Sequence, residues 1–178
     1  MVKKFSFFLF SIFSTLCFSQ QLVQERANIT FFSNAPIEDI FSESKQCIST
    51  LNGDKKLFSF EMKITSFSFK NPLMKEHFND NYLESKKFPV GSFKGNILGD
   101  FDLSKDGVYK VFVTGKLLIH GVAKQRKIPG KIIVRNGKVN IEAKFAIKLE
   151  EHDVKVPSIM TKKIAEIVEI NVSINYKN

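Results

Sequence analysis

The sequence predicts an all-β domain, an antiparallel β-barrel of eight strands with one or two short helices. Three observations support this fold class. Apolar and polar residues alternate over long stretches, eight such stretches follow one another, and Asn-Gly or Asp-Gly pairs stand between several of them. Amphipathic strands in such a series must either stack as two sheets or close, and closure removes the exposed edges. An eight-stranded barrel can hold packed side chains or one small ligand.

The N-terminus has the form of a secretory signal peptide. Lys3 and Lys4 precede an apolar run over residues 5–18, and small or polar residues follow. This run is shorter than the roughly 18 to 20 residues that a transmembrane helix needs. We therefore expect a signal peptide over residues 1–19, one domain over residues 20–178, and export to the periplasm or out of the cell. The alternative is lipidation at Cys17, although Leu16 stands where a small residue is preferred.

Removal of the leader changes the composition of the chain. Two of the 27 basic residues and none of the 18 acidic ones lie in it, so the formal charge falls from +9 to +7. Cys47 becomes the only cysteine, which excludes an internal disulfide and leaves the fold to its hydrophobic core. The lysines occupy alternate strand positions, without a basic helix or zinc-ligand spacing. We expect no nucleic-acid partner and at most weak peripheral contact with an anionic membrane.

The alternation of apolar and polar residues locates the strands. It is clearest from Val139 to Leu149, where every second residue is apolar and most residues between are charged or amide. In the third strand the apolar set shifts phase near Thr65 or Ser66, which indicates a β-bulge. The eight expected strands cover residues 27–33, 45–52, 57–69, 88–98, 108–119, 124–135, 138–150 and 166–176.

The pair Asn136-Gly137 predicts a two-residue type I′ turn, because both central positions of that turn need positive φ. Asp106-Gly107 fits a longer connection, and Asn52-Gly53 marks a third turn. The register predicted around Asn136-Gly137 sets Arg135 opposite Lys138, Val134 opposite Val139, Ile132 opposite Ile141, Lys131 opposite Glu142 and Ile128 opposite Phe145.

Three short segments read as helical or irregular, at residues 36–41, 72–82 and 158–165. In the second of them Pro72 suits the first turn of a helix. This segment is either a plug that seals one end of the barrel or a cover over a cavity, with His77 or Tyr82 near the polar end of a ligand.

The inward positions carry Phe, Ile, Val and Met, which suits an apolar guest. A buried chain with on the order of 500 Å² of apolar surface would gain roughly 12 kcal/mol before the entropic costs of binding. The alternative is a barrel filled by its own side chains. The candidate ligand-binding residues are Phe58, Phe60, Met62, Phe93, Val111, Val113, Ile141, Phe145, Ile170 and Val172 inside the barrel, with His77, Phe78 and Tyr82 at the rim.

The histidines His77, His120 and His152 give no catalytic or metal-binding pattern. No HxH or HExxH spacing occurs, and the sequence has neither a nucleophile elbow nor a phosphate loop. We therefore expect no metal, no catalytic residue and no enzymatic activity. His120-Gly121 reads as a hairpin turn in which the glycine takes positive φ and the imidazole fixes the loop by hydrogen bonds.

Two stretches carry a resemblance to a known family. They are MKEHFNDNYLESKKFPVGSFKG, residues 74–95, and LLIHGVAKQRKIP, residues 117–129. Together they resemble the YceI-like family of exported, lipocalin-like barrels named for polyisoprenoid binding. Three family features are missing: the His-Ser pair before the first strand and the Lys-His soon after it are absent, and Ala123 replaces the usual Thr. The residues that fall on the motifs are His77, Ser85, Phe88, Pro89, Phe93, His120, Gly121, Val122 and Lys124.

The resemblance implies an exported lipid-binding protein that holds a long isoprenoid, quinone or fatty chain inside the barrel, as a carrier or sequestering protein. It implies no covalent chemistry and no cofactor other than such a bound lipid. Two alternatives stay open: a barrel-based enzyme on a small or lipid substrate, and a filled barrel that acts through its outer surface. The oligomeric state, monomer or homodimer, is also open.

Overall fold

The computed structural model of the 178-residue chain describes residues 21–34, 39–155 and 166–177. The predicted signal peptide, and the segment 158–165 that was expected to be helical or irregular, lie outside the described residues. Over the described residues, no helix is long and apolar enough to cross a bilayer.

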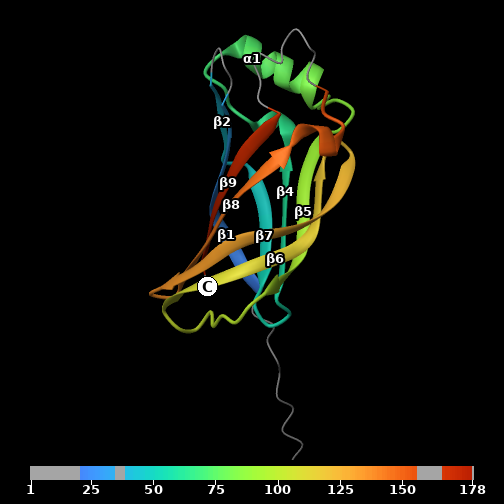
Figure 1. The fold of residues 1–178 in the computed structure, drawn as a ribbon. Helices are drawn as coiled ribbons and strands as arrows, with labels where there is room; N and C mark the ends of the chain where they lie inside the picture. Colours follow the sequence, from blue (N-terminus) through green and yellow to red (C-terminus); the bar gives the residue numbers. More distant parts are fainter. Residues whose placement is uncertain (1–20, 35–38, 156–165, 178) are drawn as a thin grey trace, which may run out of the picture.

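The chain forms an antiparallel barrel in which sequential strands are neighbours (Figure 1). Pairing of the first strand with the last closes the sheet. The strands are β1 (Gln21–Ser33), β2 (Ile40–Ser44), β3 (Cys47–Asn52), β4 (Leu57–Lys63), β5 (Val90–Leu98), β6 (Gly107–Ile119), β7 (Val122–Arg135), β8 (Lys138–Lys148) and β9 (Ile167–Lys177). The helical segments are η1 (Ile64–Ser66), α1 (Pro72–His77), η2 (Phe78–Tyr82) and η3 (Leu149–His152).

The described strands number nine because one wall of the predicted eight-stranded barrel is split. β2 and β3 pair with β1 in the same register, with Ser44 opposite Ile29 and Leu51 opposite Leu22. The barrel is therefore of the predicted class. The expectation that residues 36–41 are helical or irregular is wrong for Ile40 and Phe41, which begin β2. Residues 36–38 lie outside the described residues. The inward residues Ser42 and Ser44 of β2 are buried but polar, which hid the alternation in the sequence.

The predicted third strand ends earlier than expected. β4 stops at Lys63, and the expected bulge is a short 3₁₀ turn, η1. Beyond it the chain runs beside β2, where Ser42 Oγ donates to the Ser68 carbonyl oxygen at 2.7 Å and the Ser44 and Ser66 hydroxyls are 2.7 Å apart. These bonds satisfy the buried serines of β2.

β7 and β8 pair only over the half of their hairpin nearest to the turn. Asn136 and Gly137 have φ of 50° and 73°, as a type I′ turn requires, and the predicted register is confirmed from Arg135 opposite Lys138 to Gly130 opposite Ala143. The predicted pairing of Ile128 with Phe145 is wrong, because the strands separate beyond Gly130.

Proline at position 129 explains this separation. The residues that flank a two-residue turn bond to each other, so every second residue from Arg135 back to Pro129 directs its backbone towards β8. Pro129 has no N–H to donate. The ladder to β8 lacks a donor at this point, whereas β7 stays paired with β6 as far as Val122.

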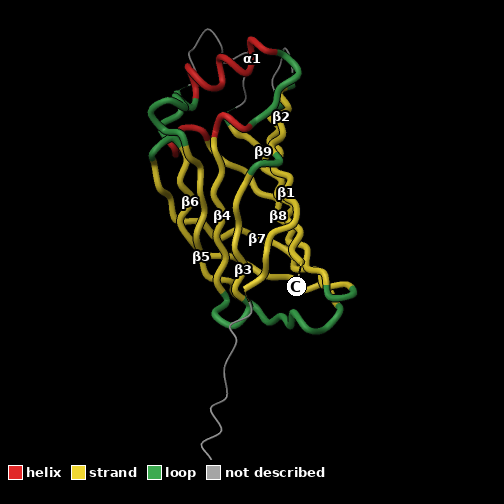
Figure 2. The backbone as a smooth tube through the Cα atoms, turned by 180° about the vertical axis from the view of Figure 1, so that it is seen from behind, coloured by secondary structure: helices red, strands yellow, loops and turns green. Residues whose placement is uncertain are grey.

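The two ends of the barrel differ in packing. At the end away from α1, Leu51, Ile174 and Tyr176 have no exposed surface, and the Tyr176 hydroxyl lies 2.8 Å from Ser49 Oγ. α1 and η2 lie across the opposite end (Figures 1 and 2). The sequence left open whether the interior is filled. In the structure, side chains fill the end away from α1, whereas the larger of the internal cavities lies at the α1 end.

Candidate functional site

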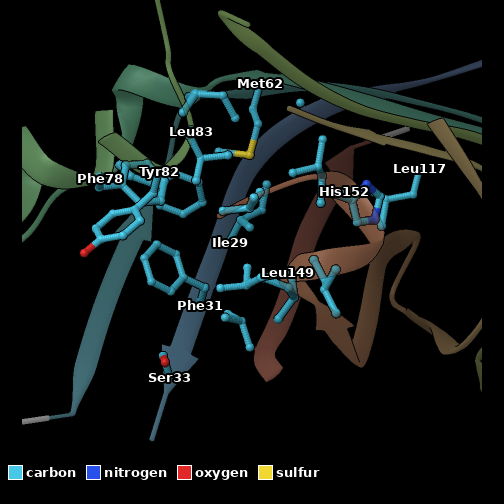
Figure 3. Close-up of a pocket in the computed structure, with 18 of the residues that line it drawn as sticks. Ile29, Phe31, Ser33, Met62, Phe78, Tyr82, Leu83, Leu117, Leu149 and His152 are labelled. Carbon is cyan, nitrogen blue, oxygen red and sulfur yellow. The ribbon is translucent and has the colours of Figure 1, made fainter. Parts of the chain in front are cut away.

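A cavity of about 140 Å³ lies in the barrel beneath α1 and η2 (Figure 3). Its wall is almost entirely apolar and draws on most strands of the barrel together with the helical segments. The labelled residues of this wall in Figure 3 are Ile29, Phe31, Ser33, Met62, Phe78, Tyr82, Leu83, Leu117, Leu149 and His152. Such a wall accepts hydrocarbon and disfavours charged groups, because it offers them no compensating partners.

A second cavity of about 40 Å³ lies deeper in the barrel. Phe58, Phe93 and Val113 contribute to its wall. Phe60 and Phe145 line both cavities and therefore form the partition between them. Movement of these two rings would join the cavities into one longer space.

An aromatic cluster holds the segment over the first cavity in place. The ring of Phe78 stacks on that of Phe31 with centroids 5.4 Å apart, and it contacts Phe67 and Phe69 at 5.6 and 5.0 Å. Asn71 caps α1 by accepting a hydrogen bond from the Leu73 backbone N–H at 2.9 Å. The segment formed by α1 and η2, which we call the cover, is thus anchored by apolar contacts at its centre and by the cap at the start of α1.

Two histidines join the cover, the β6–β7 turn and η3. His120 Nε2 lies 2.8 Å from Glu84 Oε2, and His120 Nδ1 lies 3.1 Å from the His152 carbonyl oxygen. Both partners accept, so the ring satisfies both when each nitrogen carries a proton. His120 and Gly121 have φ of 49° and 74°. The prediction that His120 is a turn residue fixing its loop by hydrogen bonds is confirmed.

The segment η3 spans the gap that Pro129 leaves between β7 and β8. Arg126 of β7 pairs with Glu151 of η3. The imidazole of His152 is fully buried, and its Nδ1 lies 3.1 Å from the Val122 carbonyl oxygen. Side-chain bonds therefore connect the two strands where the backbone ladder is missing.

Burial lowers the pKa of His152, and the charges of Arg126 and Lys124 lower it further. The hydrogen bond to Val122 and the carboxylate of Glu151 act in the opposite direction. The net shift is downward, so His152 is a neutral ring on an apolar wall at neutral pH.

Reactive groups are few in the part of the chain that the structure describes. There, no three His, Cys, Asp or Glu side chains gather in a way that could hold a metal ion. Burial raises the pKa of the Cys47 thiol to about 11, so it is protonated and weakly nucleophilic at neutral pH.

The structure places most of the predicted ligand-binding residues on the two cavity walls, while their role in binding stays a prediction. His77 lines neither cavity and ends α1 half-buried. The first cavity is lined by Phe60, Met62, Phe78, Tyr82, Phe145 and Ile170, and the second by Phe58, Phe60, Phe93, Val111, Val113, Ile141, Phe145 and Val172.

Sequence reasoning missed wall residues of two kinds. Ile29 and Phe31 could have been predicted as wall residues, since they alternate in β1 and share its inward face. Leu149 ends the apolar alternation that begins at Val139, whereas His152 and Val154 carried no signal, because the charged stretch around them reads as solvent-exposed.

Comparison with known proteins places this architecture in a family. The family profile of the YceI-like domain matches residues 21–176. The chain belongs to the YceI-like family. Among curated proteins, the comparison gives no match.

Solved structures share the YceI-like fold at low sequence identity, which shows the fold alone. BcnA of Burkholderia cenocepacia is 16% identical, with a TM-score of 0.71 over 84% of this chain and 95% of its own. A polyisoprenoid binding domain from Saccharophagus degradans, implicated in plant cell wall breakdown, is 12% identical, with a TM-score of 0.74 over 88% and 97%. Campylobacter jejuni YceI is 17% identical, with a TM-score of 0.65 over 98% and 99%.

Several of the residues that carry the YceI-like resemblance lie together between η2 and the β6–β7 turn. The Phe88 ring packs edge-on against His120 with centroids 4.5 Å apart. A Cβ at Gly121 would lie 2.5 Å from Phe88 Cε1, so only glycine fits there. Ser85 is buried, and its backbone N–H donates to the Asn79 carbonyl at 2.7 Å. These contacts join the segment that follows η2 to the β6–β7 turn.

The lowered pKa of His152 predicts a stability that falls in mild acid. The unfolded chain binds a proton near the ordinary pKa of 6.5, and the folded chain binds it only at lower pH. The free energy of unfolding should therefore decrease as the pH falls below about 6.5, by up to about 1.4 kcal/mol per pH unit from this group. Urea unfolding of wild type and of His152→Phe at pH 7.5 and 5.5 measures the difference.

The control is His77→Phe, which removes a histidine that lines neither cavity. It should keep the wild-type pH dependence, whereas His152→Phe should flatten it. Equal slopes in all three proteins would contradict the assignment.

Proposed function

We propose that this YceI-like protein is exported and binds a long apolar lipid, an isoprenoid, quinone or fatty chain, inside its barrel as a carrier or sequestering protein. The observation that carries the proposal is the apolar cavity of about 140 Å³ beneath α1 and η2. Family membership supports it, as does the common fold with a domain described as polyisoprenoid binding.

The size of the cavity limits what it holds without rearrangement. An apolar cavity of about 150 Å³ accepts a guest of the size of benzene. The first cavity therefore fits only a segment of a long chain. A longer chain has to displace Phe60 and Phe145 to reach the second cavity, or leave past the cover. We therefore propose that these two phenylalanines determine the length of the lipid chain that is bound.

The wall of the first cavity is almost entirely apolar, so we propose binding without catalysis and without a cofactor. Burial of hydrocarbon supplies the affinity, at roughly 0.8 kcal/mol for each methylene removed from water. The enzyme alternative would need a reacting pair on the wall, and none of the described wall residues forms one.

The outer face of β5, β6 and β7 supports weak, peripheral binding to an anionic membrane. Six basic residues occupy outward positions of these strands, Lys94, Lys110, Lys116, Lys127, Lys131 and Arg135, and the three strands carry no acidic residue. Lys94 stands opposite Lys116, and Lys110 opposite Lys131, in repulsive cross-strand pairs. An anionic surface would relieve this repulsion, and a lipid carrier needs such a surface to load or unload.

Lipid mass spectrometry tests the central proposal. The protein is purified from its native host, and an organic extract is analysed together with an extract of the same protein after delipidation. We expect one isoprenoid, quinone or fatty chain in about stoichiometric amount in the first extract. Repeatedly clean extracts, together with no thermal shift on adding quinones or fatty acids, would contradict the proposal.

Removal of one ring of the partition should lengthen the preferred ligand. In Phe145→Ala the two cavities become continuous, so binding should shift to longer chains in a series of fatty acids or prenyl alcohols. The stability cost should stay below the roughly 3–5 kcal/mol of a fully buried phenylalanine, because Phe145 is half-buried. Displacement of a fluorescent fatty acid measures the affinities. Phe41→Ala, on an exposed ring, is the matched control and should leave the length preference unchanged.

Neutralisation of the basic face should weaken binding to anionic vesicles. Each lysine near such a surface contributes about 1 kcal/mol, so the triple variant Lys94→Gln, Lys116→Gln, Lys127→Gln should lose at least tenfold in apparent affinity for vesicles that contain phosphatidylglycerol. Cosedimentation at low and at physiological salt measures it. The triple variant Lys45→Gln, Lys55→Gln, Lys75→Gln lies on other elements and is the control. An equal loss of vesicle affinity in both variants would mean that binding depends on the net charge of the protein and not on this face.

A further inference from the structure

A groove of about 610 Å³ crosses the outer face of the barrel. It lies where β7 and β8 diverge towards the α1 end (Figure 1). Outward side chains of β1, β6, β7, β8 and β9 line it, most of them polar, around the ring of Phe112, which is 46% exposed. Among the described residues, the groove therefore offers charged and amide groups that the wall of the first cavity lacks.

The lining of this groove is cationic. Its described charged residues are Lys110, Lys131, Lys144 and Glu142. Lys144 pairs with Glu169, 2.8 Å away and outside the groove. Lys110 stands opposite Lys131, and such pairs of like charge are destabilising. Glu142, on the other side of Lys131, offsets only part of this repulsion, so an anion in the groove would be stabilised.

The floor of the groove is at the same time a wall of the second cavity. Pro129, Gly130 and Ala143 are among the residues that line both spaces. Gly130 has no side chain and Ala143 has only a methyl group, so the backbone of β7 and β8 forms most of the barrier at this point. A single layer of sheet therefore separates the groove from the cavity.

This barrier coincides with the end of the β7–β8 ladder. Gly130 opposite Ala143 is the last pair, because Pro129 supplies no N–H for the next bond. Pairs at the end of a ladder open at a lower free energy than pairs inside it. Parting of β7 and β8 at this pair would join the groove to the second cavity.

We propose that the groove binds the ionised head of the lipid, while the tail passes between Gly130 and Ala143 into the second cavity. Lys110 and Lys131 hold the head outside the barrel, because a charge against the apolar wall inside would lack partners. The inference rests on the proposed lipid-binding function. It narrows the ligand class to lipids with an anionic head, and it places the entry in the side of the barrel.

A matched pair of ligands tests the head site. Decanoate and its methyl ester share the tail, and only decanoate is charged at pH 7.5. Wild type should bind decanoate roughly tenfold more tightly than the ester, the effect of charge-assisted hydrogen bonds from the two lysines. In the double variant Lys110→Gln, Lys131→Gln this preference should disappear, with the affinity for the ester nearly unchanged. Isothermal titration calorimetry measures the four affinities.

The control is the double variant Lys55→Gln, Lys138→Gln, which removes the same charge outside the groove and both cavities. It should keep the preference for decanoate. Loss of the preference in both double variants would show that net charge and not the groove selects the acid, which overturns the head site.

A reversible clamp tests the passage. A Cβ at Gly130 would lie 3.8 Å from Ala143 Cβ, the spacing of a disulfide, so Gly130→Cys with Ala143→Cys should cross-link when oxidised. Stopped-flow fluorescence then measures the uptake of a fluorescent fatty acid. The oxidised protein should load at least tenfold more slowly than the same protein after reduction. The control clamp, Val134→Cys with Val139→Cys, joins a facing pair of the same hairpin outside the groove and both cavities, and should load equally in both states.

The outcomes separate this inference from the function on which it rests. Equal affinities of wild type for acid and ester, or equal loading of the clamped protein in both redox states, overturn the inference and leave lipid binding intact. Failure of both ligands to bind overturns both. If the clamp does not form, Ala143→Leu narrows the same passage and should also slow loading; an unchanged rate overturns the inference.

Discussion

The missing donor of Pro129 is the constraint on which the cavity depends. A ladder continued beyond Gly130 would draw Ile128 and Phe145 into facing positions, and the α1 end would close as tightly as the other end. Because Pro129 cannot donate, β8 departs from β7 while it stays paired with β9 along its whole length. The opening between β7 and β8 at this end therefore has a backbone cause.

The bonds that replace the ladder give the α1 end its character. The pair Arg126–Glu151 and the two histidines connect η3, the β6–β7 turn and the cover through side chains. Side-chain bonds at a partly exposed end open more easily than the packed core around Leu51 and Tyr176. For the proposed lipid ligand, the α1 end is therefore the end that opens at the lower cost, and the packed end serves as the rigid base.

The sequence predicts those parts of this fold that depend on local rules. Alternation and the turn chemistry of Asn136-Gly137 suffice to predict the barrel class and the β7–β8 register in the half of the hairpin nearest the turn. They fail at two kinds of residue. Ser42 and Ser44 point inward although they are polar, and Pro129 ends the pairing with β8 although its strand alternates regularly. His152 is out of reach for a different reason. Its partners Val122 and His120 are about 30 residues away, and no periodicity relates positions in different elements.

Affinity and selectivity have separate sources in this site. Burial of hydrocarbon against the wall stabilises any apolar chain by a similar amount per methylene, so it discriminates weakly between ligands. In the proposed function, the partition of Phe60 and Phe145 limits the length of the apolar chain that the two cavities hold.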